Sequence, residues 1–302
     1  MLTESELVAI ITARAAEVGV RVWLHAADLD GPRQMGIDAE EPVVTASVFK
    51  VPVAVELARQ AADGEFDLAE RIVVAPGHPT ASPYGLATFR HDVTMSWYDL
   101  AVLMIGISDN VATDLILGKV GKAAVAKTLR RLDLPHTAVP HDCGELLRTI
   151  GEDIGIDYQD DERILAALPA EQLAKLRALT PEETCRTTAA ESTRLLGLIW
   201  RDEAAPAAAC ADVRRWLELQ VWPHRLRSGF ADDDVRISGK TGTLPSLRNE
   251  IGVVEYPDGG RYAVGVFTRA VDARSRVPER DAFIGFAAAQ AVDWLRRGPY
   301  LP

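Results

Sequence analysis

The pattern of apolar and polar residues changes twice along this chain. Near the N-terminus, Thr3 and Glu6 form a capping box, which predicts a helix running to about Val18. From Val20 to Asp28 apolar and polar residues alternate as in a half-buried strand, and residues 33–38 can return as a second strand. The chain is therefore expected to begin with one helix and a pair of strands.

The middle of the chain is predicted to be mainly helical. Residues 47–62 form a mostly apolar stretch that ends near Gly64, which is typical of a buried helix. A second capping box, Ser96 with Asp99, precedes another helix. The pattern is weakest over residues 133–186. Further helices are expected at residues 111–119, 122–132, 162–168, 171–179, 188–201 and 212–219.

Near residue 235 the spacing of apolar residues becomes that of strands. Residues 235–241, 250–256 and 261–268 are predicted strands, and a Pro-Asp-Gly-Gly turn at residues 257–260 joins the last two as a hairpin. Residues 278–297 indicate a closing helix.

Strands at both ends of the chain, around a helical middle, predict an α/β fold. We expect an antiparallel sheet of about five strands flanked by the terminal helices, an αβα sandwich, with an all-helical subdomain inserted into it. No internal repeat or low-complexity linker divides the chain, so we expect a single domain over residues 1–302. Its α/β part would comprise about residues 1–42 and 225–302, and its helical part about residues 43–224.

Composition narrows the range of partners. The 302 residues are 48% apolar, which is ample for a core. The net charge is −11, and no basic block occurs among the 27 Arg and 6 Lys, so we expect no nucleic-acid partner. No segment approaches the roughly 18 consecutive apolar residues of a membrane span, so we expect no membrane partner either. The expected partner is a small-molecule substrate, and the expected state is a monomer.

Two further predictions concern metals and the cell compartment. Cys143, Cys185 and Cys210 are odd in number and have no metal-ligand spacing, and the six His residues are scattered. We therefore expect free thiols, no metal and no cofactor. The N-terminus lacks a basic start and the hydrophobic core of a signal peptide, so we expect a cytoplasmic protein, or a secreted one if a leader was removed.

Three short motifs carry the candidate chemistry. Ser47 stands three residues before Lys50, Ser108-Asp109-Asn110 follows, and Lys240-Thr241-Gly242 comes last. A serine hydroxyl is a poor nucleophile unless a base takes its proton, and Lys50 shares a helix face with Ser47. A second cation nearby helps a lysine to lose its proton, and Lys240 is the candidate.

Other residues of these motifs have roles of their own. Ser108 is placed to relay a proton, and Asn110 to hold a substrate amide. A histidine base for Ser47 is not excluded by the sequence, but Lys50 makes it unnecessary.

The chain resembles the class A β-lactamases and the wider penicillin-recognising serine hydrolases. The likeness covers the three motifs and the stretches around them, such as ASVFKVPVAVELA and SGKTGTLPSLRNEIGVVEYPDG. It implies the αβα layout already inferred and an acylated nucleophile at Ser47. Some relatives carry a disulfide at positions that match Ala54 and Ala101, so that link is absent here.

The resemblance also implies roles for residues near the third motif. The backbone N–H groups of Ser47 and Thr243 would form the oxyanion hole. Lys240 and Thr241 would bind a substrate carboxylate, with support from Arg248. Gly242 would let the strand approach the substrate backbone, since a side chain would block it.

One departure from the family pattern affects the release of the acyl group. Class A enzymes carry a Glu-x-x-Leu-Asn motif whose glutamate activates the hydrolytic water, and this sequence has none. Glu145 lies near the expected distance along the chain, but Leu-Leu-Arg follows it, and a helix-start acid is the favoured interpretation.

We interpret the chain as a serine hydrolase related to class A β-lactamases, forming an acyl-enzyme on Ser47 with a carboxylate-bearing lactam, amide or ester. Two alternatives stay open: a carboxylesterase or D-alanyl peptidase on the same machinery, and a sensor that β-lactams acylate without turnover.

Overall fold

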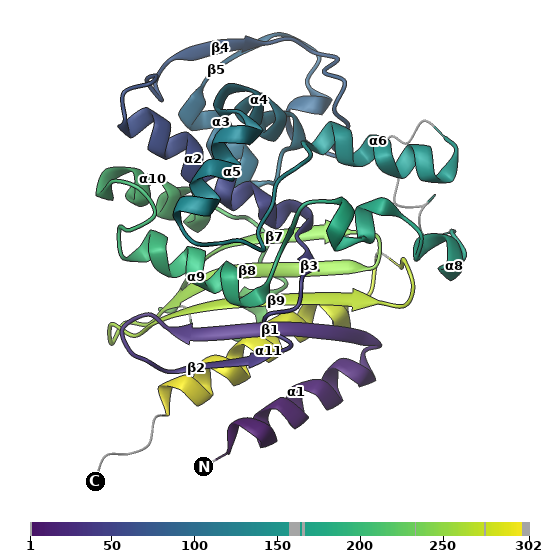
Figure 1. The fold of residues 1–302 in the computed structure, drawn as a ribbon, viewed down its shortest axis with the longest axis vertical. Helices are drawn as coiled ribbons and strands as arrows, with labels where there is room; N and C mark the ends of the chain where they lie inside the picture. Colours follow the sequence, from purple (N-terminus) through teal and green to yellow (C-terminus); the bar gives the residue numbers. More distant parts are fainter. Residues whose placement is uncertain (1, 157–163, 165–166, 233, 275, 298–302) are drawn as a thin grey trace.

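A five-stranded sheet forms the centre of the structure (Figure 1), in which every neighbouring pair of strands is antiparallel. The computed structural model describes residues 2–156, 164, 167–232, 234–274 and 276–297. From edge to edge the strands are β2 (Gln34–Ile37), β1 (Val20–Asp28), β9 (Arg261–Ala270), β8 (Leu247–Glu255) and β7 (Arg236–Leu244). Strands from both ends of the chain thus share one sheet, and the predicted fold class is confirmed.

The sheet is buried on both faces, because successive side chains of a strand point to opposite sides. On β1, Leu24 and Ala26 pack in one core with α1 (Glu4–Glu17) and α11 (Pro278–Arg296), whereas Trp23 belongs to the core on the other side. In Figure 1, α1 and α11 lie below the sheet, and α2, α3, α4 and α5 lie above it.

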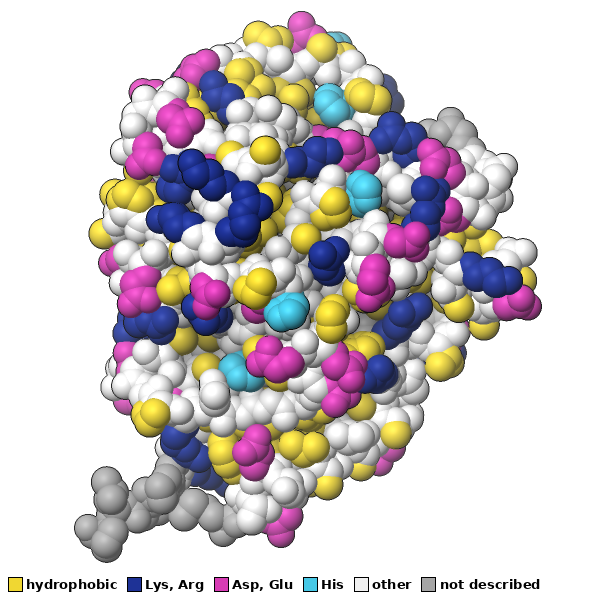
Figure 2. Space-filling model, in the orientation of Figure 1, with side chains coloured by type: hydrophobic (Ala, Val, Ile, Leu, Met, Phe, Trp, Pro, Cys, Tyr) yellow, Lys and Arg dark blue, Asp and Glu magenta, His cyan; other side chains and the backbone are white. Residues whose placement is uncertain are grey.

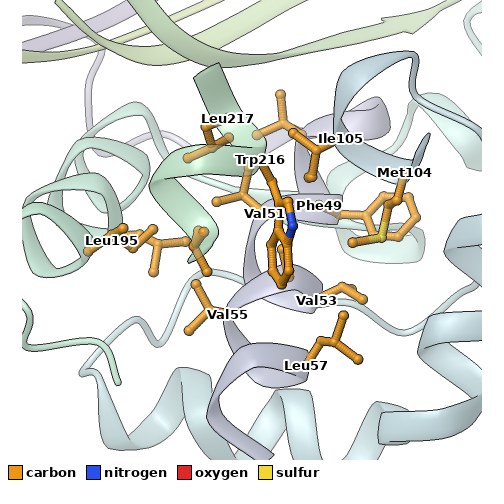
Figure 3. Close-up of a cluster of buried hydrophobic side chains, with 14 of the residues drawn as sticks. Phe49, Val51, Val53, Val55, Leu57, Met104, Ile105, Leu195, Trp216 and Leu217 are labelled. Atoms are coloured by element: carbon orange, nitrogen blue, oxygen red, sulfur yellow. The ribbon is translucent and has the colours of Figure 1, made fainter. Parts of the chain in front are cut away.

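The helical layer is built around α2 (Lys50–Ala62), most of whose residues are buried. Figure 3 shows the indole of Trp216, which is fully buried, surrounded by Val51, Val53 and Val55 of α2. A helix buried on nearly all sides cannot shift easily, so the residues at its N-terminal end are held in place. The other helices of this layer are α3 (Trp97–Gly106), α4 (Asn110–Val120), α5 (Lys122–Arg131), α6 (Cys143–Ile154), α8 (Ala170–Leu173), α9 (Ala189–Trp200) and α10 (Ala207–Glu218).

Two short strand pairs, which the sequence did not predict, complete the layer. β3 (Val43–Val44) pairs with β6 (Arg186–Thr187), and β4 (Arg71–Val74) pairs with β5 (Val93–Ser96). The strand β3 directly precedes the turn that carries Ser47, at the point where the chain enters the helical layer.

Several predicted boundaries are corrected. The predicted helix at residues 47–62 is a 3₁₀ turn, η1 (Ala46–Phe49), followed by α2. Residues 171–179 contain only the end of α8 and a 3₁₀ turn, η3 (Arg177–Leu179), because these apolar side chains fill small local clusters instead of one helix face. Most of the helix predicted at residues 162–168 lies outside the described residues.

Capping explains two further differences. The Thr3–Glu6 capping box is present, but Ser96 is capped only in part, since Asp99 accepts a bond from the Ser96 hydroxyl at 2.7 Å instead of from its backbone. A helix start at Glu145 was expected but the extent of α6 was not, although Asp142 and Glu145 form a capping box at its start and Gly155 ends it in the left-handed conformation. The three-residue spacing of Asp142 and Glu145, followed by Gly155, is the sequence signal from which this helix could have been predicted.

Figure 2 shows acidic and basic side chains interspersed over the face in view, apart from a cluster of Lys and Arg over the region of α5. Within the described residues, the helices are too short or too polar to cross a membrane.

Candidate active site

The three motifs of the sequence meet at one pocket of about 260 Å³ between the sheet and the helical layer. Ser47 comes from η1, Ser108 and Asn110 from the start of α4, and Thr241 and Thr243 from β7. The remaining lining residues are Pro83, Tyr84, Trp222, His224, Arg225, Arg248 and Asp281. Lys50 and Lys240 are completely buried at this site.

The turn that carries Ser47 has an unusual backbone. Ala46 has φ of +46°, a conformation that is uncommon for a residue with a side chain. The preceding Thr45 fixes the turn by donating from its N–H and its hydroxyl to the carbonyl of Cys185, at 3.0 and 2.9 Å. Backbone strain that the surroundings enforce is common at functional sites, and here it immediately precedes the candidate nucleophile.

Gly242 is required by the packing of the protein itself. A Cβ at this position would lie 2.5 Å from the carbonyl oxygen of Thr45 and 3.2 Å from the side chain of Ala46. The glycine therefore lets β7 pack directly against the Ser47 turn. Its role in letting the strand approach a substrate backbone stays a prediction.

Lys50 connects the first two motifs. Its Nζ donates to the Ser108 carbonyl at 2.7 Å, the Asn110 Oδ1 at 2.9 Å and the Ser108 hydroxyl at 3.2 Å. Ser108 can face Lys50 with both groups because it adopts φ of +65°. The helix-face argument had predicted a contact of Lys50 with Ser47, whereas the side-chain hydrogen bonds of Lys50 go to Ser108 and Asn110.

Lys240 is the second buried lysine of the site. Its Nζ donates to the Thr241 carbonyl at 2.9 Å. Burial and the positive charge of Lys50 hold the pKa of Lys240 well below its usual value. The positive charge of Lys50 therefore acts on Lys240, whereas the predicted effect of Lys240 on the proton of Lys50 stays a prediction.

The edge of β7 presents a backbone donor to the pocket. β7 is the outermost strand, and the Thr241 N–H donates away from β8 to the side chain of Gln220, at 2.6 Å. Since alternate residues of a strand direct their N–H groups to the same side, the Thr243 N–H also faces the open edge. Ser47 lines the same pocket, which is the arrangement that the predicted oxyanion hole requires.

Two arginines border the pocket near Thr243. Arg248, which the sequence indicated, donates to the Leu247 and Leu244 carbonyls at 2.8 and 3.1 Å. Arg225, which it missed, donates to Thr243 Oγ1 at 2.9 Å and to Asp281 at 2.7 Å. No local motif marks Arg225, because only tertiary packing brings the segment before η5 (Leu226–Gly229) to this place.

An aromatic wall closes one side of the pocket. The rings of Tyr84 and Trp222 have centroids 5.5 Å apart, and those of Trp222 and His224 are 6.2 Å apart. Burial and the charge of Arg225 lower the pKa of His224. These side chains offer an apolar surface to a substrate next to the cationic end of the pocket.

Glu145, the candidate base for deacylation, lies in another groove. That groove has a volume of about 810 Å³ and runs between α6 and residues 78–81. The Glu145 carboxylate pairs with Lys122 at 2.5 Å and accepts the Asp142 N–H at 2.9 Å. Burial opposes ionisation, but the bonds from Lys122 and Asp142 lower the pKa of Glu145 overall. Its position confirms the helix-start interpretation.

The start of α6 is attached to α4 through Asp114. Its carboxylate accepts bonds from the Cys143 and Gly144 N–H groups at 2.7 and 2.9 Å and from Thr80 Oγ1 at 2.7 Å. The neighbouring Cys143 thiol is buried, which raises its pKa and makes it a poor base. The described residues that line the Ser47 pocket include one carboxylate, which belongs to Asp281. Arg225 forms an ion pair with it.

The described residues contain no cluster of three or more His, Cys, Asp or Glu side chains suited to a metal ion.

The sequence matches the family described as "Beta-lactamase enzyme family" over residues 4–295, and the chain belongs to this family. It is 30% identical over 314 residues to the β-lactamase regulatory protein BlaB of Streptomyces cacaoi, with 98% of this chain and 99% of that protein covered. It is 25% identical over 289 residues to the extended-spectrum β-lactamase PER-1 of Pseudomonas aeruginosa, with 92% and 83% covered.

Solved structures confirm the fold. A β-lactamase from Sphaerobacter thermophilus superimposes with a TM-score of 0.77 at 23% identity, covering 99% of this chain and 100% of that one. A point mutant of PBP-A, solved as an acyl-enzyme complex with penicillin G, gives 0.75 at 18% identity, with 96% and 97% covered. The family includes relatives named for regulation as well as for β-lactam hydrolysis, so membership alone does not decide the activity.

Proposed function

We propose that the protein is a serine hydrolase that forms an acyl-enzyme on Ser47 with a lactam, amide or ester bearing a carboxylate. The observation that carries the proposal is the meeting of Ser47, the Lys50–Ser108 hydrogen bonds and the edge of β7 at one pocket. This combination supplies a nucleophile, a proton path and a backbone donor for the developing oxyanion.

Acylation would proceed in two proton movements. As Ser47 Oγ attacks the carbonyl carbon, its proton passes to Lys50 Nζ, and the carbonyl oxygen becomes an oxyanion held by the N–H groups of Ser47 and Thr243. When the bond to the leaving group breaks, a proton must reach that group. Ser108, whose hydroxyl is 3.2 Å from Lys50 Nζ, is placed to relay it.

A carboxylate on the substrate would lie at the cationic end of the pocket. Thr241 and Thr243 contribute hydroxyl groups there, and Arg225 and Arg248 contribute charge, partly balanced by Asp281. Charge-assisted hydrogen bonds of this kind fix orientation as well as affinity.

Slow release of the acyl group is the feature that separates the candidate functions. The water that attacks the acyl-enzyme needs its own base, and Glu145 is bound to Lys122 in a different groove. This favours a protein that β-lactams acylate and leave slowly, over an efficient β-lactamase. The regulatory name of the Streptomyces relative supports the sensor candidate. Hydrolysis of small esters or D-alanyl peptides would instead support the carboxylesterase or D-alanyl peptidase.

A labelling experiment distinguishes these functions. The protein is incubated with a fluorescent penicillin, with nitrocefin and with a chromogenic ester, and intact mass is recorded over minutes. We expect a penicilloyl adduct and little nitrocefin turnover. Ester turnover without an adduct would favour the carboxylesterase, and fast nitrocefin turnover would favour a true β-lactamase. Absence of reaction with every probe would contradict the proposal.

A further inference from the structure

The side chain of Arg225 is committed to the protein itself, although this residue lines the pocket. It is buried, with 4% of its surface exposed, and four hydrogen bonds join its guanidinium group to other segments. The acceptors are the carbonyls of Gly242 and Asn249, each at 3.0 Å, Thr243 Oγ1 at 2.9 Å and Asp281 Oδ1 at 2.7 Å. A guanidinium group has five N–H donors, so little of its capacity is left for a ligand.

Three of these bonds hold the end of β7 against β8. Gly242 on β7 and Asn249 on β8 are direct partners in the register, so Arg225 bonds to both strands at one rung of the ladder. It also holds the next residue of β7, Thr243, by its hydroxyl. Because β7 is an edge strand, its ladder bonds lie on one side only, and such additional bonds fix its position.

Asn249 extends this arrangement to the nucleophile turn. Its side chain is buried, and Nδ2 donates to the carbonyls of Val44 and Thr45, at 2.9 and 3.3 Å. These two residues directly precede the 3₁₀ turn that carries Ser47. The residue whose carbonyl Arg225 holds is therefore also bonded to the segment that positions Ser47.

The helix α11 holds Arg225 from the other side. It supplies Asp281 in its first turn and, one turn later, Gly285. A Cβ on Gly285 would lie 2.5 Å from the carbonyl oxygen of Arg225, and a Cβ on Gly229 of η5 would overlap the Gly285 carbonyl. The backbone around Arg225 is thus packed directly on α11, and neither its main chain nor its side chain can shift easily.

We propose that Arg225 is a positioning residue for acylation: it fixes the end of β7 so that the N–H groups of Thr243 and Ser47 face the same oxyanion. This inference rests on the proposed function of Ser47. The task goes beyond the charge that Arg225 adds to the pocket, because Asp281 pairs with the guanidinium group and the backbone of two strands accepts its N–H groups.

The chain offers a matched control in Arg280, on α11. This residue is also 4% exposed, and it donates to both oxygens of Asp272, at 2.8 and 2.9 Å, and to the Val18 carbonyl at 3.3 Å. Arg225 and Arg280 are each buried, paired with an aspartate and bonded to a backbone carbonyl. Of the two, Arg225 is the one that reaches β7.

The first test separates positioning from carboxylate binding. Arg225→Lys keeps the positive charge but replaces the planar fork by a single amine. The maximal rate of acylation by a fluorescent penicillin should fall roughly 10- to 100-fold, with little change in the half-saturating concentration. Acylation by a chromogenic ester that lacks a carboxylate should fall by a similar factor. Arg280→Lys should lose stability and keep both rates.

A contrary result of this test is equally specific. If Arg225→Lys weakens only the affinity for penicillin, and the ester reacts at the wild-type rate, Arg225 serves the substrate carboxylate and the positioning role is overturned. Wild-type rates with both probes would overturn it as well.

The second test observes the acyl group directly. Two fixed N–H donors polarise the ester carbonyl of a penicilloyl adduct and lower its stretching frequency, which infrared difference spectra with a ¹³C-labelled carbonyl can measure. In Arg225→Lys the band should move to higher frequency, and in Arg280→Lys it should stay in place. An unchanged band in Arg225→Lys would contradict the proposal.

The third test does not depend on acylation, so it separates this inference from the proposed function. Amide hydrogen exchange over residues 240–250 should be roughly tenfold faster in Arg225→Ala than in Arg280→Ala, and Arg225→Lys serves if Arg225→Ala unfolds. Exchange at the wild-type rate would overturn the hold on β7. Faster exchange in a protein that no probe acylates would retain this hold and reject the function proposed for Ser47.

Discussion

The Ser47 pocket and the α6 groove, which Glu145 and Asp114 line, differ in how completely they are equipped for catalysis. At the Ser47 pocket, Ser108 and Asn110 hold the Lys50 amine through hydrogen bonds. In the α6 groove the carboxylates serve the structure: Asp114 accepts backbone donors of α6, and Glu145 pairs with Lys122. The pocket is equipped to form an acyl-enzyme, whereas the described residues of the groove show no base to release it.

This difference follows from the separate needs of the two half-reactions. Attack by Ser47 requires a base close to its own hydroxyl, and release requires a base that faces a water molecule on the acyl carbon. The two bases come from different segments of the chain, so one segment can change while the other is retained. The helix α6 occupies the segment in which class A enzymes carry their glutamate motif.

Loss of the nucleophile should have the largest effect. Ser47→Ala removes the oxygen that bonds to the acyl carbon, so covalent labelling by a fluorescent penicillin should disappear. The control Ser5→Ala, exposed on α1, should label like the wild type. Labelling that persists in Ser47→Ala would mean that another residue is acylated.

Release of the acyl group should be slow, because the described residues of the α6 groove supply no base for the hydrolytic water. Absence of one general base typically lowers a rate by ~10²–10⁴-fold, so a penicilloyl adduct should remain visible by mass spectrometry after minutes. The measurement is the decay of the adduct after excess penicillin is removed. Rapid steady-state hydrolysis of penicillin without a detectable adduct would show that a base for the hydrolytic water is present after all.

The two buried lysines should matter for acylation, each for its own reason. Lys50→Ala removes the proton acceptor, and Lys240→Ala removes charge at the carboxylate end, so each should slow labelling by roughly 10²-fold or more. Lys127→Ala, on α5 and outside the pocket, is the control. If Lys50→Ala labels at the wild-type rate, a different base must act, and the histidines would be tested next.

Stability should depend on pH through Glu250. Burial raises the pKa of Glu250 to about 7, from an ordinary value of 4.5. The folded protein therefore holds this proton more tightly than the unfolded chain, and the associated stability is present below pH 4.5 and falls as the pH rises to about 7. Glu250→Gln should lose this slope. Denaturant unfolding at pH 5 and 8 should show the change, on the order of 1 kcal/mol.

The smallest effect should come from Glu145. Glu145→Gln weakens the ion pair with Lys122 and part of a capping box, so it should lower the free energy of unfolding by about 1 kcal/mol or less. Decay of the acyl adduct should stay at the wild-type rate. A clear slowing of that decay would identify Glu145 as the deacylating base and remove the contrast between the Ser47 pocket and the α6 groove.

Elements with strong local signals were predicted well from the sequence. The strand over residues 20–28 has the predicted bounds, but it is not half-buried as predicted, since Trp23 packs on one face of the sheet and Leu24 on the other. The extent of α6 and the short strands β3 and β6 were missed. A strand of two residues has no recognisable period, and its stability comes from a distant partner across the fold.

The sequence by itself determined the chemistry that is available: which residues can act as nucleophile and base, the α/β class, and the lack of the glutamate motif. These follow from residue identity and short-range spacing. Only the tertiary structure decided that Lys50 bonds to Ser108, that Gly242 packs against Thr45, that Arg225 joins the pocket, and that Gln220 bonds to Glu250. Each of these contacts joins segments far apart in the chain or in neighbouring strands, and its geometry depends on packing and strand register, which local sequence does not encode.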